Sequence, residues 1–138
     1  MRFSFQDPEN RLDYFCLALS LSMYGINRFI VKDIVQIPFL RYILRCHFND
    51  YLAGICIISY VNIIFSYSKY SNIRIIHIVP AIVVGATCGI LWEYVFPIIY
   101  PRGTSDFFDV VAYMMGAGSY SIIRSITKGQ LTIHEKKD

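Results

Sequence analysis

The sequence predicts an all-α integral membrane bundle of four transmembrane helices, with an interfacial amphipathic segment between helices 1 and 2. Composition is the first observation behind this fold class: hydrophobic residues make up 55% of the 138-residue chain, charged residues make up 17%, and the mean hydropathy is +0.44. These values are more apolar than those of ordinary soluble domains. Long charge-free runs are the second observation. The length suits one transmembrane domain over residues 1–138.

Two of the charge-free runs are close to the length of a transmembrane helix. Tyr51–Ser68 and Ile75–Trp92 each hold 18 residues without Asp, Glu, Lys or Arg, and crossing the hydrocarbon layer takes about 20 residues. Tyr14–Asn27 and Val110–Ile123 are shorter. They become spans if the arginine that follows each run reaches out to the lipid headgroups. We therefore expect four helices, near residues 13–31, 49–68, 74–99 and 107–126.

A soluble helical core is the main alternative fold. Its helices would show a polar face recurring every three or four residues, whereas Ile75–Trp92 is apolar on nearly all sides. The first helix could instead belong to a signal peptide, but no basic start followed by a small-residue cleavage site is present. We therefore expect a multi-pass protein of the cell membrane that retains its first helix.

Four spans would place both termini on one side of the membrane. Lys and Arg residues flanking that side outnumber those on the other by eight to five, which predicts cytoplasmic termini. The connection at residues 32–48 contains the amphipathic stretch "IVQIPFLRYILR". We expect this connection to lie along the membrane interface.

Small residues at helical spacing predict close helix packing. Gly85 and Gly89 form a GxxxG pair, and Ala112 and Gly116 form a second small-residue pair. Such pairs let helices approach closely in lipid. They predict a compact bundle and leave open a homo-oligomer or a membrane partner protein.

Several function classes find no support in the sequence. The net charge is only +3 and no basic block stands out, so we expect no nucleic-acid partner. The four cysteines form no CxxC pair and no zinc-binding spacing. A nucleophile elbow and a phosphate-binding loop are also absent, and whether the protein is an enzyme stays open.

Polar residues from three distant segments should meet at one membrane face. "HFND" (residues 47–50) opens the second helix, "WEY" (92–94) lies near the end of the third, and "TSDFFD" (104–109) opens the fourth. Residues three or four apart share a helix face, and an ionisable residue inside a span indicates a functional site. The predicted pocket comprises His47, Asp50, Glu93, Asp106, Asp109 and Tyr113.

The residues leave several interpretations of this pocket open. Asp106 suits a helix N-cap, and the carboxylates could simply pair helices through Arg102, His47 or Arg45. A functional pocket could hold a divalent cation such as Mg²⁺, perform acid–base chemistry on a lipid headgroup, or recognise a headgroup or peptide. The cation would be held by Asp50, Glu93, Asp106 and Asp109, with His47 or water completing the shell. Of these, Asp50, Glu93 and Asp109 are the leading metal ligands.

Two stretches resemble the VanZ-like family of small membrane proteins. They are "HFNDYLAG" at residues 47–54 and "WEYVFPIIYPRGTSDFFDVVAYMMGA" at residues 92–117, the second being the more specific. The resemblance implies a four-span layout and points to His47, Asp50, Glu93, Asp106 and Asp109. Named members of the family lower susceptibility to glycopeptide antibiotics such as teicoplanin.

The resulting hypothesis is a VanZ-like membrane protein that binds or modifies a cell-envelope lipid or its headgroup through the acidic pocket. The alternative is a non-enzymatic scaffold or subunit whose charges only pair helices. An ion or proton conduit ranks last, because it needs polar residues through the whole bilayer and here they gather at one face.

Overall fold

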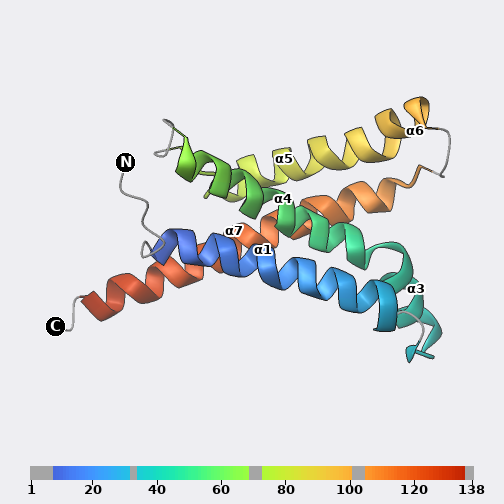
Figure 1. Ribbon diagram of the computed structural model, residues 1–138, viewed down its shortest axis with the longest axis horizontal. Helices are drawn as coiled ribbons and strands as arrows, with labels where there is room; N and C mark the ends of the chain where they lie inside the picture. The colour runs from blue at the N-terminus through green and yellow to red at the C-terminus, as the bar shows by residue number, and fades with distance from the viewer. Residues whose placement is uncertain (1–7, 32–33, 69–72, 101–104, 136–138) are drawn as a thin grey trace.

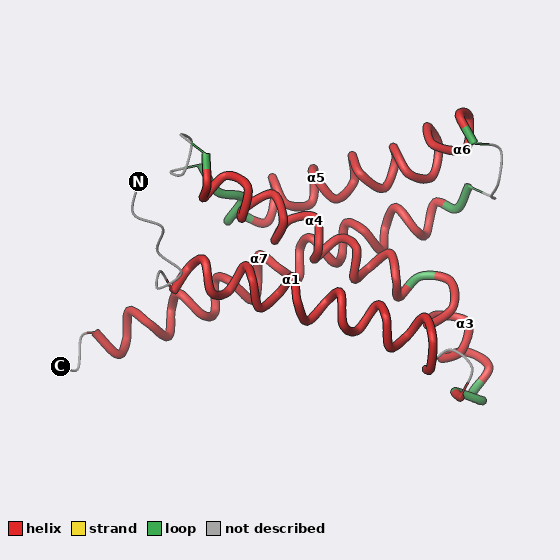
Figure 2. The backbone as a smooth tube through the Cα atoms, in the orientation of Figure 1, coloured by secondary structure: helices red, strands yellow, loops and turns green. Residues whose placement is uncertain are grey.

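The computed structural model describes residues 8–31, 34–68, 73–100 and 105–135. Within these ranges the chain is helical apart from short connections, and no strand occurs (Figure 2). The elements in chain order are α1 (Pro8–Ile26), the π-helical turn η1 (Asn27–Val31), α3 (Pro38–Cys46), α4 (Phe48–Tyr67), α5 (Ile78–Ile90), the π-helical turn η2 (Leu91–Val95), α6 (Phe96–Ile99) and α7 (Phe107–Glu135).

Four long helical stretches run side by side in alternating directions (Figure 1). They are α1 with η1, then α4, then α5 continuing through η2 into α6, and finally α7. The start of α1 and the end of α7 lie at one end of the bundle, and α3 and α6 lie at the other. The all-α fold is confirmed, whereas the fourth transmembrane span and the interfacial segment stay predictions.

Three helix boundaries differ from the prediction. The first helix begins at Pro8 rather than near residue 13, and the other two differ for identifiable reasons. The third helix begins at Ile78 rather than near residue 74, because the side chain of Asn62 binds the backbone of Ile75 on both sides: the Ile75 N–H donates to Asn62 Oδ1 at 2.7 Å, and Asn62 Nδ2 donates to the Ile75 carbonyl at 3.1 Å. The last helix continues to Glu135. A helix need not stop where its apolar stretch stops, and no proline follows Arg124.

Three helical segments are long and apolar enough to cross a membrane: Asn10–Val31, Pro38–Tyr67 and Ile78–Ile99. Large apolar side chains project outward from all of them, among them Phe15 and Val79, with 62% and 68% of their surface exposed. A soluble monomer rarely exposes so much contiguous apolar surface. These features suggest a membrane protein, in which lipid covers the outward-facing side chains.

The core is built around α7, which packs against α4 and α5, while α1 packs against α4. Glycine makes the close approach possible at these crossings. A Cβ atom added to Gly116 would collide with the backbone carbonyl of Tyr51, and one added to Gly85 would lie 2.9 Å from the Cβ atom of Ala117. The close packing predicted for the small-residue pairs is confirmed.

A buried polar network, which we call the Asp13 network, joins α1, α4 and α7 at the end of the bundle that holds the termini. Asp13 is fully buried, and its Oδ1 atom accepts hydrogen bonds from Tyr120 Oη and, at 2.5 Å, from an Arg124 guanidinium nitrogen. Asn62 Nδ2 donates to Tyr120 Oη at 2.8 Å. Arg74 lies 3.6 Å from the second Asp13 oxygen. The network therefore encloses one carboxylate between two arginines.

The Asp13 network corrects the expectation for Arg124. This residue was expected to extend to the lipid headgroups, but only 1% of its surface is exposed. Its guanidinium also donates to Tyr120 Oη at 2.6 Å. Because an arginine can enter a low-dielectric interior when it is paired and hydrogen-bonded, Arg124 binds its helix to α1 instead of reaching the surface.

Candidate functional site

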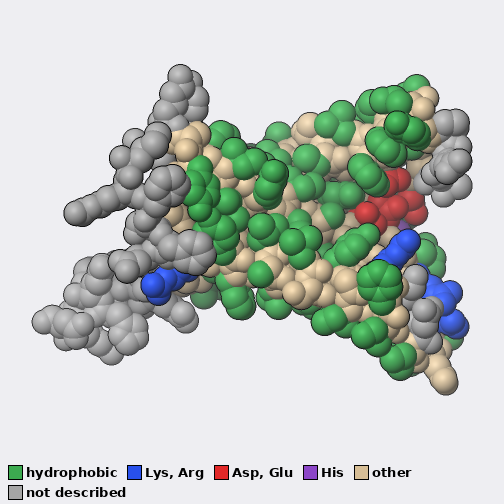
Figure 3. All heavy atoms as spheres, in the orientation of Figure 1, with side chains coloured by type: hydrophobic (Ala, Val, Ile, Leu, Met, Phe, Trp, Pro, Cys, Tyr) green, Lys and Arg blue, Asp and Glu red, His purple; other side chains and the backbone are tan. Residues whose placement is uncertain are grey.

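The six predicted pocket residues come from three elements at the end of the bundle opposite the termini. His47 lies just before α4, Asp50 lies in the first turn of α4, and Glu93 lies in η2. The remaining three residues belong to α7 or to the connection just before it. In the space-filling view, acidic side chains form one patch at this end of the molecule (Figure 3). We call this group the acidic site.

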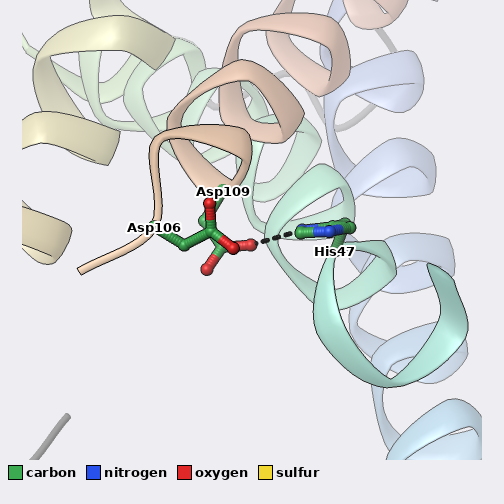
Figure 4. A group of neighbouring side chains, drawn as sticks. All are labelled: His47, Asp106 and Asp109. Carbon is green, nitrogen blue, oxygen red and sulfur yellow. Dashed lines mark hydrogen bonds and ion pairs between the residues drawn. The ribbon is translucent and has the colours of Figure 1, made fainter. Parts of the chain in front are cut away.

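His47 and Asp109 form the direct contact between α4 and α7 in the acidic site. His47 Nδ1 lies 2.7 Å from Asp109 Oδ1, with 18% and 17% of the two side chains exposed (Figure 4). The imidazole also packs edge-on against the ring of Tyr42, with ring centroids 5.4 Å apart. His47 lies at the joint between α3 and α4. His47 therefore links the end of α3 to Asp109 in the acidic site.

Glu93 is the most buried carboxylate of the acidic site, with 8% of its surface exposed. Its Oε2 atom accepts a hydrogen bond from the Asp106 backbone N–H at 3.2 Å, and its backbone carbonyl accepts one from Ser105 Oγ at 2.6 Å. These contacts bind the segment before α7 to η2. Asp106 in turn accepts from the Phe108 N–H at 2.9 Å, so the predicted N-cap role of Asp106 is confirmed.

Both π-helical turns lie at this end of the bundle, and each contributes a buried polar side chain. A π-helical turn changes the direction of the side chains that follow it and often occurs at functional sites. In η1, Asn27 is 1% exposed, and its Nδ2 atom donates to the Leu44 carbonyl at 2.7 Å and to Asn49 Oδ1 at 2.8 Å. Asn27 thus fixes the joint that holds His47. The sequence analysis missed this residue.

Asp50 and Tyr113 complete the acidic site without a direct hydrogen bond to its other members. Asp50 lies within electrostatic range of Glu93, Asp109 and His47, and Tyr113 lies within range of the three carboxylates at 50, 93 and 109. Only 6% of Tyr113 is exposed. The described residues provide no hydrogen-bond partner for its hydroxyl.

The charges of the acidic site are unbalanced among the residues the structure describes. Four carboxylates lie there. Asp109 forms an ion pair with His47, and the other three form none with a described residue. Arg45, one arginine considered as a partner, forms no ion pair with the four carboxylates within the described residues, although it has interactions elsewhere. Arg102, the other arginine considered as a partner, lies outside the described residues. A region with this excess of negative charge attracts cations and cationic groups.

An apolar groove of about 390 Å³ opens beside the acidic site, between α4 and the helix formed by α5, η2 and α6. Tyr113 belongs to both, since it lines the groove and lies within electrostatic range of the carboxylates. The volume is within the range of small-molecule sites. The lining residues are Ile57, Cys88, Leu91, Trp92, Val95, Phe96, Ile99 and Tyr113.

Three side chains of the acidic site are arranged so that they could share a metal ion. One ligand atom from each of His47, Asp106 and Asp109 lies within 4.8 Å of the others (Figure 4). All three were among the ligands considered from the sequence, whereas Asp50 and Glu93, which were also considered, do not belong to this group. A donor set of one imidazole and two carboxylates fits a transition-metal ion better than Mg²⁺, which prefers oxygen ligands throughout.

No protein-family model, curated protein or solved structure matches the chain. The VanZ-like resemblance therefore stays a prediction. Function has to be argued from the acidic site and its surroundings.

Proposed function

We propose that this protein is a four-span integral membrane protein that binds the headgroup of a cell-envelope lipid at the acidic site. The observation that carries this proposal is the position of the site: a half-buried, negatively charged cluster at one end of an apolar bundle, beside an apolar groove. A lipid has the same arrangement, a polar group attached to apolar chains. Lipid is also the molecule that surrounds a membrane bundle.

In this proposal α7 is the fourth span. Its central part, residues 110–123, carries no charged residue, and Met115 and Ile122 project outward from it. Arg124 is compatible with a span because it is paired with Asp13. We also place α3 along the membrane interface, where its exposed side chains Phe39 and Leu40 would contact lipid. If the termini are cytoplasmic, the acidic site faces the outer side of the membrane.

The electrostatic setting favours a headgroup that brings positive charge. Burying a carboxylate without a counter-charge costs free energy, and this cost is recovered when a cationic group binds. The attraction is stronger than in water because the nearby apolar helices lower the local dielectric constant. The positive charge could belong to an ammonium group of the lipid or to a divalent cation bound to its phosphate.

The experiment is native mass spectrometry of the detergent-purified protein, comparing the wild type with Glu93→Gln. We expect the wild type to retain lipid and the variant to lose it, since the amide keeps the shape of the side chain and removes its charge. Asp13→Asn is the matched control: it makes the same carboxylate-to-amide change in the Asp13 network and should leave lipid retention in the folded fraction unchanged.

Other outcomes would identify the alternatives. Lipid retention that disappears on addition of EDTA would favour the second candidate function, a divalent-cation site at His47, Asp106 and Asp109. If wild type and Glu93→Gln retain the same lipids and the variant unfolds at a lower temperature, the carboxylates only stabilise the bundle. The protein would then be a scaffold or a subunit.

The VanZ-like resemblance adds a biological consequence to this proposal. Expression of the chain in a susceptible bacterium should raise the minimal inhibitory concentration of teicoplanin, and Glu93→Gln should remove the increase. If the minimal inhibitory concentration is the same with and without the protein, the resemblance does not extend to antibiotic resistance. The lipid-binding proposal would be unaffected.

A further inference from the structure

The hydroxyl of Tyr113 marks the boundary between the acidic site and the groove. The side chain is more than nine-tenths buried, yet among the described residues its hydroxyl has no hydrogen-bond partner. The hydroxyl oxygen itself is not among the buried polar atoms that lack a partner, so it reaches the surface. A hydroxyl at the edge of an apolar groove gains a hydrogen bond when a polar ligand group binds there. Because Tyr113 lines the groove, a molecule bound there can supply the partner.

The π-helical turn η2 explains why a polar site and an apolar groove adjoin one another. Leu91, Trp92 and Val95 line the groove, while Glu93 between them hydrogen-bonds to the start of α7. One short segment therefore contributes to both surfaces. A single ligand with a polar end and an apolar end can contact the two together.

The charges at this end of the molecule match a zwitterionic ligand. Lys or Arg side chains border the acidic patch (Figure 3), and the neighbouring elements η1 and α3 contribute the exposed residues Arg28 and Arg41. Carboxylates attract an ammonium group and arginines attract a phosphate. An anionic lipid without an amine offers no charge that the carboxylates can neutralise.

We propose that the ligand is a phospholipid with a primary-amine headgroup, and that one of its acyl chains lies in the groove. The ammonium group donates hydrogen bonds to the carboxylates of the acidic site, among them Glu93 and Asp50. The Tyr113 hydroxyl donates to an ester or phosphate oxygen where the headgroup meets the chain. This inference rests on the proposed function and specifies its ligand class.

The chain contains a single tryptophan, Trp92, which lines the groove and can report its occupant. The protein is placed in nanodiscs of phosphatidylglycerol that contain increasing fractions of brominated-chain lipid with either an ethanolamine or a glycerol headgroup. Bromine quenches tryptophan fluorescence on contact. We expect the ethanolamine lipid to reach half-maximal quenching at about a tenfold lower fraction, a difference of the size that one charge-assisted hydrogen bond produces.

Matched variants separate the groove from the headgroup contacts. Cys88→Phe fills the groove and should lower the quenching by both brominated lipids, whereas Val83→Phe, on the exposed side of the same helix and outside the groove lining, should not. Tyr113→Phe keeps the ring and removes a hydroxyl that binds an oxygen common to both lipids, so quenching by both should weaken several-fold while the ethanolamine preference stays. Glu93→Gln removes a carboxylate that binds the ammonium group and should reduce the preference itself.

Three outcomes would overturn the inference. Equal quenching by the two lipids would remove the amine assignment. A preference for the glycerol headgroup that EDTA abolishes would replace the ammonium with a cation-bridged phosphate. Ethanolamine lipid retained in native mass spectrometry, together with quenching that Cys88→Phe leaves unchanged, would place the chain outside the groove and leave the proposed function intact. Loss of the proposed function itself would be seen as a wild type that retains no lipid.

Discussion

Asp13 and Glu93 are both carboxylates buried in apolar helices, but their surroundings differ. Asp13 is enclosed by Arg124, Tyr120 and Arg74, so its charge is matched and its oxygen is hydrogen-bonded. Glu93 accepts a single backbone N–H through its carboxylate and lies near other acidic residues. The first arrangement matches its charge within the protein, although Asp13 Oδ2 accepts no hydrogen bond. The second lacks a counter-charge among the described residues.

This difference separates a structural polar group from a binding group. A buried charge that the protein pairs internally holds helices in place and offers nothing to a ligand. A buried charge that the protein leaves unbalanced costs stability unless something else binds. The Asp13 network should therefore determine how stable the bundle is, and the acidic site should determine what it binds.

The largest expected effect is on stability at the Asp13 network. Asp13→Asn leaves Arg124 buried without its carboxylate, and breaking such a pair typically costs about 3–5 kcal/mol. Asp109→Asn should change the free energy of unfolding by only about 1 kcal/mol, because the amide oxygen can still accept a hydrogen bond from His47 and no buried cation loses its partner. Thermal unfolding in detergent compares the two. If Asp109→Asn unfolds first and Asp13→Asn behaves as wild type, the roles assigned to the two regions are reversed.

A smaller effect is expected from one substitution made at two tyrosines of α7. Tyr120→Phe removes a hydroxyl that bonds Asp13, Asn62 and Arg124, so we expect a loss of about 1–3 kcal/mol in the free energy of unfolding. Tyr113→Phe removes a hydroxyl without a partner among the described residues and should leave stability unchanged. Chemical denaturation in mixed micelles measures both. Equal destabilisation by the two variants would show that Tyr113 also has a structural bond.

The smallest stability effect is expected at His47, where lipid and metal binding make opposite predictions. His47→Leu breaks a contact whose two side chains are partly exposed, so the free energy of unfolding should change by less than about 1 kcal/mol. Amine-lipid retention should persist, because the carboxylates lose their internal counter-charge. A metal ion held by His47, Asp106 and Asp109 would be lost. Native mass spectrometry distinguishes the two results.

Much of the fold could be predicted because the governing signals are local. Charge-free runs identify helices, and Gly85 at GxxxG spacing indicates a close helix crossing, which the contact with Ala117 confirms. Topology extended this reasoning to the acidic site. The start of the second helix, the end of the third and the start of the fourth had to lie at one end, and His47 does contact Asp109.

The features that were missed depend on contacts between distant residues. Arg124 follows an apolar run, and its sequence neighbours give no indication that Asp13, 111 positions earlier, lies beside it. Asn62 looks like an isolated polar residue within a span, but it pairs with Tyr120 and with the backbone of Ile75. The π-helical turn at Glu93 also leaves no clear signal in the sequence, because the same residues suit an α-helix.

The sequence by itself determined that the chain forms apolar helices and that its acidic residues gather at one end, because span length and alternating direction fix which segments share a membrane face. Only the tertiary structure decided which charges are neutralised. Pairing depends on distances of a few ångströms between helices, and these follow from how α7 packs against its neighbours. That packing encloses Asp13 between arginines and leaves Glu93 and Tyr113 beside an apolar groove.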